Sequence, residues 1–228
     1  MYKIYFEGFW NNFDIENNFF TKLLKKYYNI SINSKNYDVV IVSCFNKKKI
    51  DLKKNVRKIF YTGENINYKK DYDFNFTFKP NSVKNIRLPL WVINYKNNPN
   101  FDYHVQYEKN SFCCFVASNN IKYRNDFCNL LSKKYKKVDC GGKCLNNINR
   151  IVEDKITFQR KYKFCIVFEN YSSPGYVTEK ILDSYRSWCV PIYWGAKNIK
   201  IDFNPKTFIN VHDFNNLHDL IDYIIKVD

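Results

Sequence analysis

The residues best suited to chemistry are Asn170, Tyr176, Glu179 and Lys180, which follow the apolar run Phe164–Phe168. A lysine in the first turn of a helix, where helix stability alone favours an acid, is suited to bind a phosphate. Asparagine and tyrosine side chains nearby can hydrogen-bond ribose or sugar hydroxyls. Taken singly, each of these residues also fits an ordinary surface loop or helix, so the elements that hold them must be considered.

These residues lie between two apolar runs, Phe164–Phe168 and Cys189–Trp194, in the segment 162–195. A polar turn with Pro174 and Gly175 follows the first run, and a stretch with helical apolar spacing follows the turn. The order strand, loop, helix, strand predicts a βαβ unit. Because ligands bind beyond the carboxyl ends of strands in open α/β sheets, the pattern predicts an anion site there.

Two further residues occupy comparable places. Glu64 follows the predicted strand 56–61 behind a glycine turn, where a carboxylate can act as a general base. Arg124 lies at the start of the predicted helix 124–135, where a guanidinium can contact a diphosphate through two hydrogen bonds. From position alone, Glu64 also fits a solvated turn acid and Arg124 a surface arginine.

The composition indicates a globular protein. The chain has 228 residues, of which 45% are hydrophobic and 19% aromatic, enough for a core in one large domain or two smaller ones. Its longest apolar runs, such as Val39–Val42, are far shorter than the ~20 residues that a spanning helix needs. The first ten residues lack the hydrophobic region of a signal peptide. We therefore expect a soluble, cytoplasmic protein with no transmembrane segment.

The eight cysteines give little support for a metal site. Cys140 and Cys144 form the only metal-like pair, and the three histidines are scattered along the chain. Other cysteines stand within apolar runs, where a free thiol behaves as a small hydrophobic group. We therefore expect free thiols and no structural zinc.

The net charge of +15 invites a nucleic-acid partner. However, the lysines are spread in short runs among many asparagines, isoleucines and tyrosines, which is typical of a compositional bias. We therefore expect no nucleic-acid partner, although DNA binding remains an alternative. The same basic field would also attract an anionic nucleotide-sugar.

Periodicity predicts two α/β halves. In the first half, we expect strands over 2–6, 37–45 and 56–61 and a helix over 13–28. Residues 71–78 alternate between polar and apolar types, and Pro89 argues against a central strand at 86–93. The polar stretch 94–110 is interpreted as a linker or an edge excursion between the halves. In the second half, we expect strands over 112–117, at 138, over 164–168, 189–194 and 208–211, and helices over 124–135 and 215–226, the last capped by Asn215 or Asn216.

The segment FENYSSPGYVTEKILDSYRSWCVPIYWG, residues 168–195, resembles the donor-binding signature of the α-1,3-fucosyltransferases, glycosyltransferase family 10. The bacterial members are the most similar. Pro174-Gly175 departs from the family, since many members carry an aspartate before the tyrosine. Further resemblances follow in order along most of the chain, in VRKIFYTGEN, IRLPLW, FCCFVASNNIKYRNDF, VDCGGKC and DFNPKTFINVHDF.

The resemblance implies a GT-B architecture, in which two Rossmann-like domains face a central cleft. Residues 1–105 would form the domain on the acceptor side, and residues 106–228 the domain that binds the GDP-sugar. The implied reaction transfers L-fucose from GDP-β-L-fucose to a GlcNAc or glucose hydroxyl of a glycan, in α-1,3 linkage and with inversion. The alternatives are the same fold using another GDP-sugar, or a nucleotide- or glycan-binding module without activity.

The resemblance also implies roles for the residues singled out above. Glu64 would be the general base, and Arg124 and Lys180 would hold the diphosphate. Contacts to ribose or fucose would come from Asn170, Tyr176 and Glu179. Cationic side chains would neutralise the phosphates, so no metal or other cofactor is obligatory. The expected partners are a GDP-sugar donor and a glycan acceptor, and peripheral contact with a membrane stays open.

Overall fold

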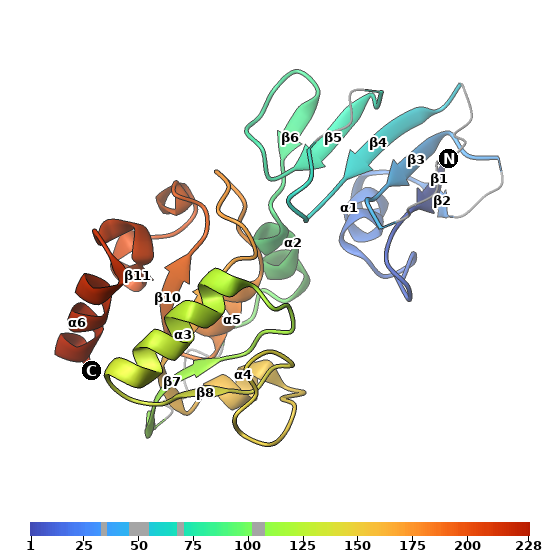
Figure 1. Ribbon diagram of the computed structural model, residues 1–228. Helices are drawn as coiled ribbons and strands as arrows, with labels where there is room; N and C mark the ends of the chain where they lie inside the picture. Colours follow the sequence, from blue (N-terminus) through green and yellow to red (C-terminus); the bar gives the residue numbers. More distant parts are fainter. Residues whose placement is uncertain (33–35, 46–54, 68–70, 102–107) are drawn as a thin grey trace. The chain divides into compact units, whose positions relative to one another are not determined.

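The chain forms two compact α/β units, Met1–Pro99 and Asn100–Asp228, each with its own parallel sheet (Figure 1). The computed structural model describes residues 1–32, 36–45, 55–67, 71–101 and 108–228. The two sheets with their helices confirm the predicted α/β class and the two Rossmann-like domains. The predicted domain boundary between residues 105 and 106 lies outside the described residues.

The first unit contains a six-stranded sheet in the order β2-β1-β3-β4-β5-β6, with every pair of neighbours parallel. Its strands are β1 (Tyr2–Glu7), β2 (Ile30–Ile32), β3 (Val39–Val42), β4 (Arg57–Tyr61), β5 (Phe74–Thr77) and β6 (Asn85–Arg87). The strand β2 was not predicted from the sequence. The strand β6 is at the edge of the sheet, which agrees with the expectation that Pro89 excludes a central strand.

The helices of the first unit are α1 (Phe19–Tyr27) and α2 (Leu90–Asn97). The predicted helix 13–28 is too long, because Asn18 caps α1 by accepting a hydrogen bond from the Thr21 amide. The linker prediction for 94–110 is wrong over 94–97, which belong to α2. Both helices pack against one face of the sheet, in a core formed by Ile4, Phe6, Phe20, Ile41, Tyr61 and Ile93.

The second unit contains a five-stranded parallel sheet in the order β11-β10-β9-β7-β8. Its strands are β7 (Ser111–Phe115), β8 (Val138–Cys140), β9 (Tyr162–Phe168), β10 (Val190–Trp194) and β11 (Ile209–Asn210). Its α-helices are α3 (Lys122–Lys134), α4 (Lys155–Gln159), α5 (Lys180–Arg186) and α6 (Leu217–Val227), and its 3-10 turns are Ile199–Ile201, Pro205–Thr207 and Val211–Asp213.

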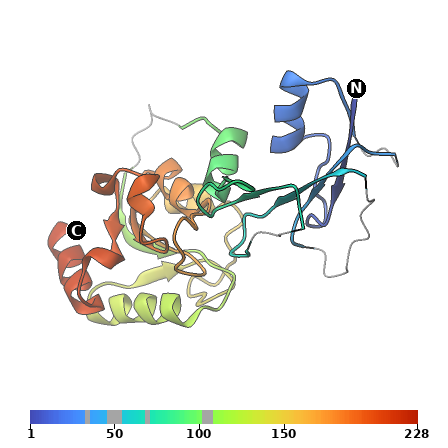
Figure 2. The ribbon, with the colours of Figure 1, turned by 90° about the horizontal axis from the view of Figure 1, so that it is seen from above.

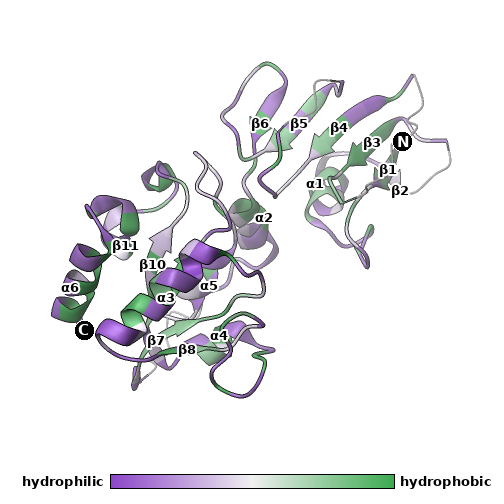
Figure 3. Ribbon diagram, in the orientation of Figure 1, coloured by the Kyte–Doolittle hydropathy of each residue, from purple (hydrophilic) through white to green (hydrophobic). Residues whose placement is uncertain are grey.

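Helices cover both faces of this second sheet, with α3 on one side of the strands and α5 on the other (Figure 2). Alternate residues of β9, such as Phe164, Ile166 and Phe168, join the core beneath α3 and α6. The side chain of Asn216 caps α6, as predicted, and the helix has one hydrophobic and one hydrophilic face (Figure 3). The predicted βαβ unit is present as β9, α5 and β10.

Both sheets share one topological feature. In each, the first strand of the unit, β1 or β7, lies between the second strand and the third. The second strand of each unit is therefore added on one side of the first strand, and the third and later strands are added on the other side. In open α/β sheets, ligands bind beyond the carboxyl ends of the two strands at this reversal point. The pairs to consider are β1 and β3 in the first unit, and β7 and β9 in the second.

Two further expectations can be compared with the structure. All eight cysteines lie in described segments and are free thiols, as expected, and all except the half-buried Cys44 are buried. Across the described ranges, no helix combines the length and the apolar character needed to cross a membrane.

Candidate functional site

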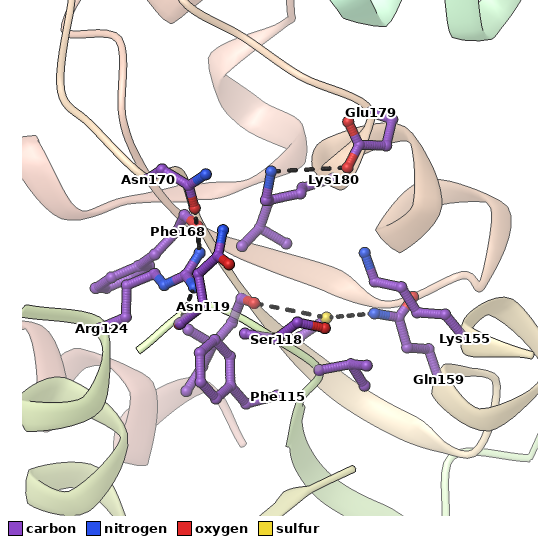
Figure 4. A pocket seen from close by; sticks show the side chains of 15 residues that line it. Phe115, Ser118, Asn119, Arg124, Lys155, Gln159, Phe168, Asn170, Glu179 and Lys180 are labelled. Carbon is purple, nitrogen blue, oxygen red and sulfur yellow. Dashed lines mark hydrogen bonds and ion pairs between the residues drawn. The ribbon is translucent and has the colours of Figure 1, made fainter. Parts of the chain in front are cut away.

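A pocket of about 210 Å³ lies at the reversal point of the second sheet (Figure 4). Residues 115–119, at the end of β7 and in the loop after it, form one wall. Residues 165–168 of β9 and Asn170 form another. Side chains from the three helices α3, α4 and α5 complete the lining. The pocket is therefore at the place where this topology predicts a ligand.

Arg124, in the first turn of α3, is 2% exposed and joins three segments around this pocket. Its Nη1 donates to the Phe168 carbonyl at 3.3 Å and to Asn170 Oδ1 at 2.8 Å, and its Nη2 donates to the Asn119 carbonyl at 2.6 Å. The guanidinium also lies 5.8 Å from the centre of the Phe115 ring. The loops after β7 and β9 are thus tied to α3 by one cation.

Within the described residues, Arg124 has no ion-pair partner. Its three acceptors are neutral oxygens, and no carboxylate lies within ion-pair distance of it in the part of the chain that the structure describes. Its Nε is buried there without a hydrogen-bond partner. Burial lowers the pKa of this guanidinium, against the opposing effects of Cys144, Glu169 and Tyr176. Because a buried charge needs a counter-charge, the arrangement favours an anionic ligand.

Glu169, directly after β9, is fully buried and organises the start of α5. Its carboxylate accepts hydrogen bonds from the Thr178 amide at 2.7 Å, from the Thr178 hydroxyl at 2.8 and 3.0 Å, and from Lys180 Nζ at 3.1 Å. The Thr178 amide therefore binds a carboxylate of the protein itself and is not open to an external anion. The residues of this segment that line the pocket are Glu179 and Lys180.

Lys180 stays charged despite its burial. Burial alone would lower its pKa, but the carboxylates of Glu169 and Glu179 outweigh that effect and raise it. Glu179 Oε1 lies 3.6 Å from Lys180 Nζ. Burial would raise the pKa of Glu179, and the cations of Lys180 and Lys155 lower it. At neutral pH this part of the pocket therefore presents ionised groups of both signs.

Lys155, at the start of α4, is a third cation of the pocket lining. Its Nζ binds Asp183 Oδ2 at 2.9 Å. Lys155 was given no role from the sequence, because residues 146–160 contain no motif that marks a site. The pocket lining contains three cations, Arg124, Lys155 and Lys180, against the single carboxylate of Glu179, so it is suited to a phosphate or diphosphate.

Two glycines allow the backbone to close around this site. A Cβ on Gly142 would lie 2.1 Å from the Ala117 carbonyl oxygen, so the loop after β8 can contact the pocket wall only without a side chain. A Cβ on Gly195 would lie 2.7 Å from Glu169 Cγ. The first glycine belongs to VDCGGKC and the second to the long motif, which explains in physical terms why both segments contain glycine.

The structure brings together four of the predicted site residues, Arg124, Asn170, Glu179 and Lys180, as lining of one pocket. Tyr176 is 2% exposed and is not among the lining residues, although its hydroxyl charge state influences the pKa of Arg124. Glu169 lies behind the pocket and was not given a role. Its place within the FEN motif was a signal, but its function depends on Thr178, nine residues later.

Glu64 belongs to the first unit, where it follows β4 and is partly exposed. Its amide donates to the Thr62 hydroxyl at 3.0 Å, and its carbonyl accepts from the Ile66 amide at 2.7 Å. Burial, with smaller effects of Cys44 and Glu64, raises the pKa of the neighbouring Tyr61 hydroxyl. This turn holds a carboxylate at the carboxyl end of the sheet, as expected, and its role as a base stays a prediction.

Among the residues with described positions, no group of three or more histidine, cysteine, aspartate or glutamate side chains is arranged to hold a metal ion. The pocket residues suited to an anion are nitrogen donors and cations, which bind phosphate oxygens directly.

Comparisons with known proteins agree with this geometry. Residues 106–228 match the family model described as glycosyltransferase family 10 (fucosyltransferase), C-terminal part. Residues 4–95 match the model of the N-terminal domain of the alpha-(1,3)-fucosyltransferase FucT. A crystal structure of an alpha1,3-fucosyltransferase with GDP-fucose matches with a TM-score of 0.86 and 29% identity, over 99% of this chain and 78% of that chain.

Curated relatives are longer than this chain. The alpha-(1,3)-fucosyltransferase FucT of Helicobacter pylori is 40% identical over 172 residues, which is 73% of this chain and 35% of that protein. The mouse 4-galactosyl-N-acetylglucosaminide 3-alpha-L-fucosyltransferase 9 is 29% identical over 166 residues, 68% of this chain and 43% of that protein. The chain thus spans about a third of the length of the first of these relatives and less than half of the second.

Proposed function

Because the chain belongs to glycosyltransferase family 10, we propose that it binds GDP-β-L-fucose at the pocket of its second unit and transfers L-fucose to a glycan hydroxyl. The acceptor hydroxyl would belong to GlcNAc or glucose, and the linkage would be α-1,3. A similar solved structure is titled as a complex with GDP-fucose, which supports this choice of donor.

The observation that carries the proposal is the buried guanidinium of Arg124, which has neutral acceptors but no carboxylate within ion-pair distance in the described part of the chain. A diphosphate supplies the missing negative charge, and Lys180 and Lys155 line the same pocket. Asn170, which is held by Arg124, and Glu179 are available for hydroxyl groups of ribose or fucose. We assign Tyr176 a supporting role beside Arg124, since it is buried and does not line the pocket.

In the proposed reaction, the acceptor oxygen attacks C1 of fucose on the side opposite the phosphate, which inverts that carbon. The bond between C1 and the β-phosphate oxygen breaks, and its electron pair stays on GDP. Arg124 and Lys180 stabilise this developing charge. The carboxylate of Glu64 takes the proton of the acceptor hydroxyl as the new bond forms. The cations perform the neutralisation that the leaving group needs, so we propose that neither a metal ion nor another cofactor is required.

The test is transfer and hydrolysis measured with a panel of GDP-fucose, GDP-mannose, UDP-galactose and UDP-GlcNAc, with EDTA present. We expect turnover of GDP-fucose only. Glu64→Gln should lower transfer by about 10²- to 10⁴-fold and leave GDP affinity unchanged, because general base catalysis contributes about that much. Glu16→Gln, which changes an exposed glutamate of the same unit, is the matched control.

Four outcomes would contradict parts of this proposal. Turnover of another GDP-sugar in place of GDP-fucose would refute the donor assignment. Equal transfer by the wild type and Glu64→Gln would refute the role of this carboxylate. GDP binding without any turnover would identify a binding module, and DNA binding that GDP does not displace would favour a nucleic-acid partner.

A further inference from the structure

We propose that the exposed rings of Trp10 and Phe45 form a platform that binds the apolar face of a pyranose ring of the acceptor saccharide. The nature of the ligand rests on the proposed function, whereas the site rests on the geometry of the first unit alone. Neither Trp10 nor Phe45 has been given a role in the sections above.

The platform lies at the reversal point of the first sheet. Trp10 follows β1 and Phe45 follows β3, and these are the two strands between which the order β2-β1-β3-β4 reverses. The Phe45 amide donates to the Gly8 carbonyl at 2.9 Å, which fixes the two loops side by side. In the second unit the equivalent place holds the cationic pocket. The same topology thus predicts a ligand beyond β1 and β3.

The two rings are exposed although they contact each other. Trp10 is 48% exposed and Phe45 is 45% exposed. Their centroids are 5.7 Å apart and their planes meet at 82°. An edge-to-face pair leaves ring faces open to a ligand. Exposed aromatic rings that adjoin one another indicate a binding surface, whereas single scattered ones do not.

A layer of aromatic rings supports the platform from below. Phe9 and Phe13 are stacked with centroids 4.0 Å apart, and Trp10 meets Phe13 at 4.9 Å and 78°. Phe9 in turn stacks against the buried Tyr61 of β4 with a centroid distance of 6.3 Å. This packing restricts Trp10, so little conformational entropy remains to be lost when a ligand binds.

Hydrogen bonds connect the loop that carries Phe45 to the turn that carries Glu64. The Thr62 hydroxyl, after β4, donates to Cys44 Sγ at 3.3 Å, and Cys44 directly precedes Phe45. The same hydroxyl accepts from the Glu64 amide at 3.0 Å. The three adjacent strands β1, β3 and β4 are therefore followed, at their carboxyl ends, by the residues Trp10, Phe45 and Glu64.

This combination fits a neutral sugar better than an anion. A pyranose has one face lined by C–H groups, which pack on an aromatic ring, and hydroxyl groups at its edge, which a carboxylate can accept from. A protein segment is the alternative occupant, but it would make the neighbouring carboxylate irrelevant. We therefore assign the platform to the acceptor saccharide.

The test measures binding of N-acetyllactosamine and lactose to the purified chain by saturation-transfer NMR and calorimetry, with and without GDP. The mouse relative is named for transfer to a 4-galactosyl-N-acetylglucosaminide, which motivates the first probe. We expect Trp10→Leu and Phe45→Leu each to weaken saccharide binding about threefold to tenfold, since aromatic contacts contribute on that scale. The conservative variants Trp10→Phe and Phe45→Tyr should restore most of it.

GDP affinity and hydrolysis of GDP-fucose without acceptor should stay unchanged in all four variants, which also reports that the protein is folded. Tyr27→Ala removes an exposed ring from the end of α1 and should have no effect. The assignment of the platform is overturned if Trp10→Leu and Phe45→Leu bind the saccharide as tightly as the wild type does. It is also overturned if the wild type binds no saccharide. Failure to bind GDP would instead overturn the proposed function, because saccharide binding is measured separately.

Discussion

Replacing Arg124 by methionine should weaken GDP binding strongly while preserving the volume of the pocket wall. A guanidinium has five N–H donors, and three hydrogen bonds hold Arg124 to Phe168, Asn170 and Asn119. Two donors remain for a diphosphate. Each charge-assisted hydrogen bond contributes about 1.5–3 kcal/mol, so their loss costs about 3–6 kcal/mol. We expect the Kd for GDP to rise by roughly 10²- to 10⁴-fold.

Calorimetry and thermal unfolding with and without GDP measure this effect. At a GDP concentration of about 100 times the Kd, ligand binding stabilises the wild type by about 2.7 kcal/mol. For a chain of this size, this corresponds to a rise in Tm of about 5–10 °C. Arg124→Met should show a rise of less than ~2 °C under the same conditions.

Arg186→Met is the matched control, because Arg186 is also buried, at 6% exposure, and pairs with Asp183 outside the pocket lining. We expect that variant to be less stable but to keep the rise in Tm with GDP. The reasoning is refuted if Arg124→Met binds GDP within about threefold of the wild type. It is also refuted if both variants lose the ligand equally, since Arg124 would then act only as structural support.

Two further predictions concern the support of the pocket. Glu169→Gln should destabilise the fold by about 1.5–3 kcal/mol, because Lys180 loses its closest carboxylate partner. Since the pKa of Lys180 is raised above its ordinary value of 10.5, this stabilisation is fully present below that pH and is lost as pH rises through the raised pKa. The difference in stability between Glu169→Gln and the wild type, measured by denaturant unfolding, should therefore be constant from pH 7 to 9 and shrink above about pH 10.5; a difference that grows with pH contradicts this assignment. Gly142→Ala should cost about 1–3 kcal/mol and weaken GDP binding, because the new Cβ would collide with the Ala117 backbone. Gly63→Ala, where the Cβ meets only side-chain atoms at 3.0 Å or more, is its control, and equal losses in both variants would show that the collision is relieved without cost.

The sequence predicted those parts of the fold whose signals are local. The apolar runs that became β9 and β10 are long and bounded by polar turns, and Asn216 carries a cap signal that needs only its next neighbours. The strand β2 has three residues and no buried one, so it carries no pattern of its own and forms only by pairing with β1. The helix α2 mixes aromatic and β-branched residues without a helical face, and only Pro89 marks its start.

The site shows the same division. The motif identified Asn170, Glu179 and Lys180, and the start of the predicted helix identified Arg124. The hydrogen bonds of Arg124 reach residues 44 and 46 positions later in the chain, so no spacing rule could reveal that the guanidinium is buried without a carboxylate. Lys155 enters the pocket from a helix of five residues that its sequence predicts only weakly.

The two units share one strand order, and we propose that they bind two kinds of ligand, so the difference must lie in the residues that follow the strands. Beyond β7 and β9 the chain provides cations, which an anionic nucleotide requires. Beyond β1 and β3 it provides two aromatic rings, with a carboxylate after the adjacent β4, which suits a neutral sugar that must lose a proton. If this division is correct, Arg124→Met should weaken GDP binding strongly and keep saccharide binding, and Trp10→Leu should do the reverse. Loss of both ligands in either variant would mean that the two surfaces do not act independently.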